Sequence, residues 1–120
     1  ELSRISLAIQ VVTVGGTGIP TVVFDEVDVG VGGRVAETVG RHMHSLSAHH
    51  QVLCVTHLPQ VASQAHAHVQ VLKQTGRRKV HTFFEHLAGD DRVEEIARML
   101  GGLDITAQTR AHAREMLSKT

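Results

Sequence analysis

The stretch from Thr21 to Asp28 constrains the fold of this 120-residue chain more than any other. It begins with four strand-forming residues, and so short an apolar run, bounded by Pro20 and by acids, predicts a buried strand of a parallel sheet. Asp25 and Glu26 follow at the carboxyl end of that strand, where open α/β sheets bind their ligands. Burying two adjacent acids is costly unless a cation or strong hydrogen-bond donors face them. The alternative is a solvated loop that happens to be acidic.

A second short apolar run, from Gln51 to Thr56, predicts a second buried strand. Between the two runs, residues 34–46 repeat apolar side chains with the spacing of a helix. The repeated positions are Val35, Val39, Met43 and Leu46. A strand, a helix and a strand at this spacing predict a βαβ unit. His57 follows the second run directly, so we expect it to open into the same crevice as Glu26.

The rest of the chain predicts further helices and one hairpin. Helices are expected over residues 1–14, 60–65, 91–100 and 106–118, and half-exposed strands over residues 68–71 and 79–83. The first helix shows an apolar stripe at Leu2, Ile5, Ile9 and Val12. Asp91 with Glu94 is typical of a capping box, and Thr106 is expected to cap the last helix. Residues 1–120 therefore predict one compact α/β unit, and a start at Glu1 inside a helix suggests a fragment.

The composition narrows the classes of partner. Twelve basic and 12 acidic residues give a formal net charge of +0, so there is no global electrostatic case for nucleic-acid or membrane binding. No apolar run approaches the length of a membrane span, and we expect no signal peptide. The single cysteine, Cys54, cannot form an internal disulfide, which fits a reducing compartment; we expect it to be a small core residue.

The residues at the strand ends suggest a division of chemical labour. Asp25 would hold Mg²⁺ through water, because Mg²⁺ keeps much of its hydration shell. Glu26 would orient and deprotonate an attacking water, a step worth about 10²–10⁴ in rate. His57 could hydrogen-bond a terminal phosphate, although a capping or surface histidine is the alternative in a chain with ten histidines. The segment Glu1 to Arg4 opens a helix, whose N-terminus attracts anions weakly.

Two other groups of residues admit alternative interpretations. The basic run Arg77 to Lys79 follows a turn and could contact DNA phosphate, or it could be a solvated hairpin tip. Histidines gather around the end of the second helix and again before the hairpin. They are His42, His44, His49, His50, His66 and His68. The first four lack the spacing of a Cys₂His₂-type zinc site. His66 and His68 alternate on a strand and would share a face, where a weak adventitious metal site is the most that the sequence supports.

An ordered set of motifs resembles the C-terminal half of the ATPase head of the SMC-like, ABC-type ATPases that act in recombinational repair of DNA double-strand breaks. The motifs are Glu1-Leu2-Ser3-Arg4, Phe24-Asp25-Glu26-Val27-Asp28, the glycine-rich turn through Gly33, Val55-Thr56-His57-Leu58-Pro59-Gln60 and Arg92 to Gly102. This resemblance implies that Asp25 is the Walker B aspartate, Glu26 the catalytic glutamate and His57 the switch histidine. It also implies that Glu1, Leu2, Ser3 and Arg4 are the tail of the signature motif. Together with Gln60 they would complete the nucleotide-binding set.

The family pattern is only partly present. No Gly-x-x-x-x-Gly-Lys-[Ser/Thr] phosphate loop occurs in the chain, nor the Ser-Gly-Gly expected before Glu1. Many relatives carry an aspartate where this chain has Gly32, which puts one contact between heads in doubt. The expected fold is therefore the C-terminal α/β lobe of a P-loop NTPase, a mainly parallel sheet with flanking helices and a hairpin.

The resemblance also implies cofactors and partners. ATP and Mg²⁺ would be the cofactors, a second ATPase head and DNA the partners, and the nucleoid-associated cytoplasm the location. The chain alone is expected to be inactive, because it lacks the Walker A loop. A non-catalytic interaction or dimerisation module and a histidine-dependent metal-binding domain are the alternatives.

Overall fold

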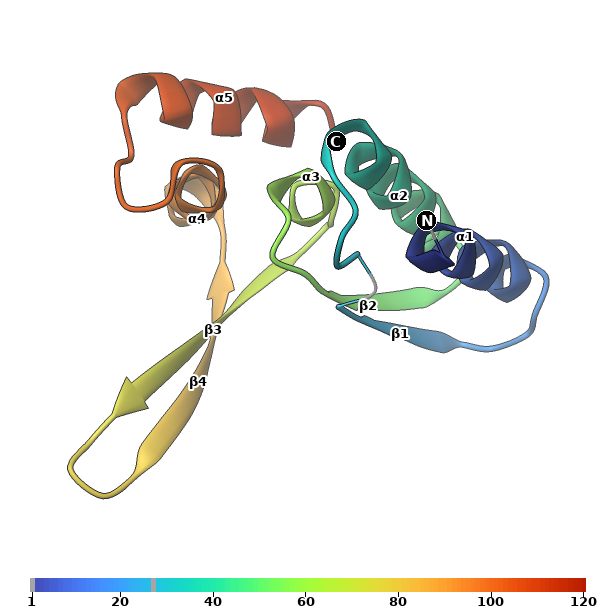
Figure 1. Ribbon diagram of the computed structural model, residues 1–120, viewed down its shortest axis with the longest axis horizontal. Coiled ribbons are helices and arrows are strands. Elements are labelled where there is room, and N and C mark those ends of the chain that lie inside the picture. Colours follow the sequence, from blue (N-terminus) through green and yellow to red (C-terminus); the bar gives the residue numbers. More distant parts are fainter. Residues whose placement is uncertain (1, 27) are drawn as a thin grey trace.

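The computed structural model describes residues 2–26 and 28–120 (Figure 1). The elements are α1 (Leu2–Gly15), β1 (Thr21–Asp25), α2 (Gly33–Leu46), β2 (Gln51–Val55), α3 (Pro59–Ala62), β3 (His68–Thr75), β4 (Val80–Leu87), α4 (Gly89–Gly101) and α5 (Ala107–Ser118). Strands and helices follow one another as the hydrophobic patterns predict. The strands form one small parallel pair and one separate antiparallel hairpin, so the description as α/β is confirmed.

β1 and β2 pair in parallel, with α2 connecting them. The register runs from Thr21 opposite Gln51 to Asp25 opposite Val55, so both strands end at the same edge. The buried residues of α2 include Met43 and Leu46, which belong to its predicted apolar face. The predicted βαβ unit is therefore confirmed within the described residues.

Only one face of this strand pair is covered. Phe24 is 2% exposed and packs with Val22, Val52 and Cys54 toward the helices. In Figure 1, α1 and α2 both lie on this side of the two strands. On the opposite face the apolar side chains are open to solvent, with Val23 62%, Leu53 50% and Val55 51% exposed. The prediction that both strands are buried is therefore wrong for the described residues, because no element of this chain covers the second face.

The predicted apolar stripe of α1 is also wrong. Ile5, Ile9 and Val12 are 58%, 59% and 78% exposed, whereas Leu7 is 2% exposed. The core-facing stripe instead consists of Leu7, Val11 and Val14. Nearly every turn of this helix carries apolar residues on more than one side, so helical spacing alone does not determine which face turns inward.

The second half of the chain is built on α4 and α5. Their core contains Ala62, Val93, Ile96, Ala97 and Ala113. Thr106 caps α5 as predicted, because its hydroxyl oxygen accepts from the Thr109 N–H at 3.1 Å. The capping box at Asp91 is wrong: α4 starts at Gly89, and Asp90 and Asp91 lie in its first turn. Carboxylates in a first turn favour the positive end of the helix dipole without capping it.

β3 and β4 form the predicted hairpin, from His68 opposite Leu87 to Thr75 opposite Val80. The Gly76 N–H donates to the Lys79 carbonyl at 2.9 Å and closes the turn. The hairpin projects away from the helices in Figure 1, and all residues from 71 to 86 are exposed. Within the residues that the structure describes, no helix is both long and apolar enough to cross a bilayer.

Candidate functional site

The carboxyl edge of β1 and β2 brings together the predicted site residues. The Glu26 N–H donates to the Val55 carbonyl at 3.0 Å, which extends the parallel ladder one residue beyond β1. Asp25 is the last residue of β1, and His57 follows β2 after one intervening residue. The side chains of Asp25, Glu26 and His57 are exposed, as access to a ligand requires. Their common edge agrees with the prediction, while their chemical roles stay predictions.

The backbone of Glu26 has an unusual conformation. Its φ is +50°, which makes Glu26 the single non-glycine residue with positive φ among residues 2–26 and 28–120. Residues other than glycine adopt this left-handed backbone conformation at a cost of about 1–3 kcal/mol. Such local strain concentrates at functional sites. Here it turns the chain sharply at the end of β1.

A polar contact behind this edge was not predicted. Asp28 is 0% exposed, and its Oδ2 accepts a hydrogen bond from the Thr56 hydroxyl. The Thr56 hydroxyl oxygen in turn accepts from the Leu58 N–H at 3.0 Å. Asp28 Oδ1 is buried with no hydrogen-bond partner. The sequence signals this contact only by placing a third acid, Asp28, shortly after Asp25 and Glu26. An acid in a loop is equally expected to be solvated, so the sequence alone does not predict its burial.

Cys54 lies next to this contact. Burial, and then the charge of Asp28, raises the pKa of the Cys54 thiol to about 11. The thiol is therefore neutral at pH 7 and a poor nucleophile or metal ligand. It packs against the core around Phe24, which confirms its prediction as a small core residue.

The other predicted nucleotide-binding residues lie elsewhere or outside the described part. Glu1 is outside the described residues, and Leu2, Ser3 and Arg4 are described only as backbone of the first turn of α1. Gln60 is half-buried in α3 and lines a cavity of about 230 Å³ together with residues of α2 and α5. Asp25, Glu26 and His57 do not line that cavity. The structure thus places Gln60 on α3, which begins two residues after His57.

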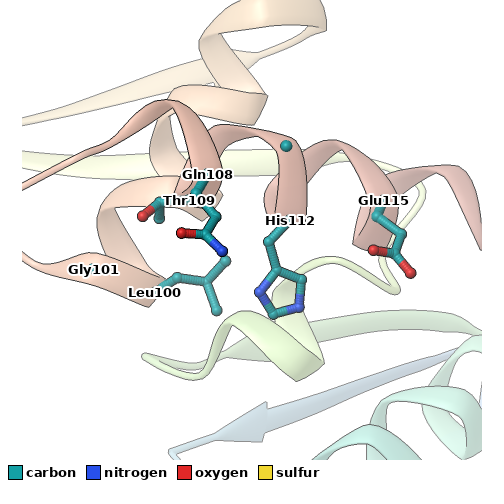
Figure 2. Close-up of a pocket in the computed structure, with 7 residues that line it drawn as sticks. Leu100, Gly101, Gln108, Thr109, His112 and Glu115 are labelled. Atoms are coloured by element: carbon teal, nitrogen blue, oxygen red, sulfur yellow. The ribbon is translucent and has the colours of Figure 1, made fainter.

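A larger hollow of about 550 Å³ lies between the end of α4 and α5 (Figure 2). Its lining residues are Leu100, Gly101, Gln108, Thr109, Ala111, His112 and Glu115. Figure 2 shows Gln108 and His112 projecting from α5 on the side of Leu100. None of the predicted site residues lines this hollow, and its lining contains no lysine or arginine that would hold a phosphate.

The histidines do not form a metal centre. The rings of His44 and His66 stack with centroids 4.3 Å apart and planes 20° apart. His44 Nδ1 lies 2.6 Å from the Gln64 carbonyl oxygen, which directs this nitrogen to the backbone. Among the residues whose positions are described, no three His, Cys, Asp or Glu side chains gather as metal ligands. The histidine-dependent metal-binding interpretation therefore has no geometric support there.

The fold and the edge define an α/β protein of the class that presents acidic and imidazole side chains at the carboxyl ends of adjacent parallel strands. No protein-family profile matches the chain. Curated relatives do: over nearly its whole length the chain matches the C-terminal part of the DNA repair protein RecN.

The similarity extends to distantly related bacteria. The chain is 52% identical to RecN of Haemophilus influenzae over 117 residues, which is 98% of this chain and 21% of that protein. It is 52% identical to RecN of Mycobacterium leprae over 117 residues, 98% of this chain and 20% of that protein. Identity to RecN of Bacillus subtilis is 40% over 119 residues, 99% of this chain and 21% of that protein. The chain thus spans about a fifth of the length of these relatives.

Proposed function

We propose that this chain is the C-terminal lobe of the ATP-hydrolysing head of an SMC-like protein that acts in repair of DNA double-strand breaks. The observation that carries the proposal is the shared edge of Asp25, Glu26 and His57 in a chain that matches RecN. Acids and an imidazole at the ends of adjacent parallel strands are suited to phosphate chemistry.

The proposed roles follow from the chemistry of each group. Asp25 holds Mg²⁺ through water, and exposed carboxylate oxygens are the donors that this hard cation prefers. When bound, Mg²⁺ neutralises charge that develops on phosphate oxygens. Glu26 orients a water molecule and accepts its proton. His57 donates a hydrogen bond to the terminal phosphate from the neighbouring strand end.

The remaining part of the head must come from other residues. Apolar side chains lie bare on the outer face of the parallel strands and on the hairpin, among them Val23, Val55 and Phe84, which is 74% exposed. Apolar side chains left exposed along one face of a sheet commonly mark a surface that another segment covers. We propose that a phosphate-loop segment elsewhere in the full-length protein packs here, and that two such heads enclose ATP.

The first test is calorimetric titration of Mg-ATP into this chain and into a full-length RecN-type protein that contains it. We expect no measurable heat of binding to the chain alone, because backbone amides that cradle the β- and γ-phosphates are missing from its sequence. The full-length protein should bind and hydrolyse ATP. Micromolar binding by the chain alone would contradict the proposal that the phosphate-binding part of the site lies elsewhere in the full-length protein. Absence of turnover in the full-length protein would contradict the ATPase role.

The bare apolar faces also favour a second candidate function. The isolated chain would then act as a non-catalytic interaction or dimerisation module. ATP turnover by the full-length protein that is unaffected by changes at Glu26 would favour this interpretation.

The hairpin tip is the part of the chain best suited to contact DNA at the nucleoid. Residues 71–84 contain four basic residues and no acid. These residues are Lys73, Arg77, Arg78 and Lys79. All four are exposed, and none takes part in an ion pair found among the described residues. A two-stranded ribbon fits the major groove, which is about 12 Å wide.

We therefore expect Arg78→Gln to weaken binding of a full-length RecN-type protein to a fluorescently labelled DNA duplex. Loss of one phosphate contact should lower the slope of log affinity against log salt by about 1. Arg114→Gln removes an arginine of α5 that is also exposed and serves as the matched control. Equal slopes for the two variants in anisotropy titrations would show that the tip is only a solvated turn.

A further inference from the structure

Two residues without a role in the proposed reaction join the loops that follow β1 and β2. Asp28 belongs to the first loop and Thr56 to the second, and the Thr56 hydroxyl donates to Asp28 Oδ2. Asp28 is 0% exposed, so its carboxylate is shielded from bulk water. A carboxylate in that position requires a hydrogen-bond donor, and Thr56 supplies the one that the described residues provide.

Thr56 transmits the contact to the backbone around His57. Its hydroxyl oxygen accepts from the Leu58 N–H at 3.0 Å, which closes a short turn with His57 as the middle residue. A free threonine hydroxyl rotates, whereas this one is fixed by a donor and an acceptor at once. The backbone that carries His57 is therefore anchored to Asp28.

The other end of the contact leads back to Glu26. The Val29 N–H lies 3.4 Å from the Glu26 carbonyl oxygen, and the Val31 N–H donates to the Asp28 carbonyl at 3.0 Å. Asp28 thus lies in the loop that follows Glu26. The Asp28–Thr56 contact therefore joins this loop to the backbone that carries His57.

We propose that Asp28 and Thr56 form a latch that sets the position of His57 relative to Glu26. Both are positioning residues, since neither is exposed as the three edge residues are. The consequence for catalysis rests on the proposed ATPase function, whereas the latch itself is a property of this chain.

The latch is tested first in the chain itself, by amide hydrogen exchange measured by NMR. Thr56→Val keeps the shape of the side chain but removes the hydroxyl, so exchange of the Leu58 amide should rise about two- to tenfold. Thr56→Ser keeps the hydroxyl and should restore the original rate. Wild-type exchange at Leu58 in Thr56→Val would overturn the latch.

A second variant keeps the test valid if Thr56→Val does not fold. Asp28→Leu is close to aspartate in volume but has no oxygen that accepts from Thr56, so exchange of the Leu58 amide should again rise about two- to tenfold. Original exchange at Leu58 in Asp28→Leu would overturn the latch, because the turn at His57 would then be held without Asp28.

Catalysis is tested separately in the full-length RecN-type protein. Thr56→Val should lower kcat about tenfold with the KM for ATP unchanged, and Thr56→Ser should recover most of it. An unchanged kcat together with faster Leu58 exchange would overturn the positioning role. If the unaltered protein hydrolyses no ATP, the proposed function fails, while the exchange measurements still decide the latch.

Discussion

Glu26→Gln in a full-length RecN-type protein is expected to lower steady-state ATP turnover by about 10²–10⁴-fold, the usual contribution of a general base. Glutamine has the same shape as glutamate and still accepts a hydrogen bond through its amide oxygen, but it does not take up a proton. ATP binding should persist, because Asp25 and the phosphate-binding groups are unaltered. The ATP-bound pair of heads should therefore accumulate.

The measurement is phosphate release under saturating ATP, with nucleotide retention followed by filter binding. Glu115→Gln is a suitable control, since Glu115 is an exposed residue of α5 that pairs with the exposed Lys119. His57→Ala should also lose turnover while the fold stays stable. Normal hydrolysis by Glu26→Gln would remove Glu26 from the base role.

Phe24→Ala is expected to lower the free energy of unfolding of this chain by about 3–5 kcal/mol. Phe24 is 2% exposed and lies at the centre of the core between the parallel strands and the helices, with Leu7 and Met43 in the same cluster. Removing its ring leaves a cavity that these neighbours fill only partly. A loss of this size is a large share of the stability of a small domain, which is about 5–15 kcal/mol.

The adjacent position provides the control for this prediction. Val23→Ala changes a residue that is 62% exposed on the uncovered face, so its effect should stay below about 1 kcal/mol. Urea denaturation followed by circular dichroism measures both. Similar losses for the two variants would mean that the uncovered face is buried in solution, for example by self-association.

The parallel pair and the candidate edge at its carboxyl end were predictable because they depend on local patterns. Two short apolar runs with a helical segment between them allow few arrangements other than a βαβ unit. The side chains that follow each run then lie at one edge without any knowledge of tertiary contacts. For this reason the sequence placed Glu26 and His57 after strands that end at the same edge, as the register shows.

What could not be predicted depends on partners that are distant in sequence. Thr56 meets Asp28 across 28 residues, and a lone acid in a loop is ordinarily solvated, so the burial of Asp28 left no signature. The stripe of α1 failed for a related reason. Apolar residues such as Ile9 occur on faces that no described element of this chain covers. Hydrophobicity therefore does not show which face of α1 packs against the rest of the chain.

The left-handed backbone of Glu26 implies a conflict between the stability of the fold and the proposed activity at this position. Glycine adopts that conformation without steric penalty, so by folding energetics alone Glu26→Gly relieves strain. Glycine, however, carries no group that takes a proton from water. A search for thermostable variants that selected only for melting temperature would therefore tend to discard the proposed catalytic side chain, and such a search needs a turnover screen beside it.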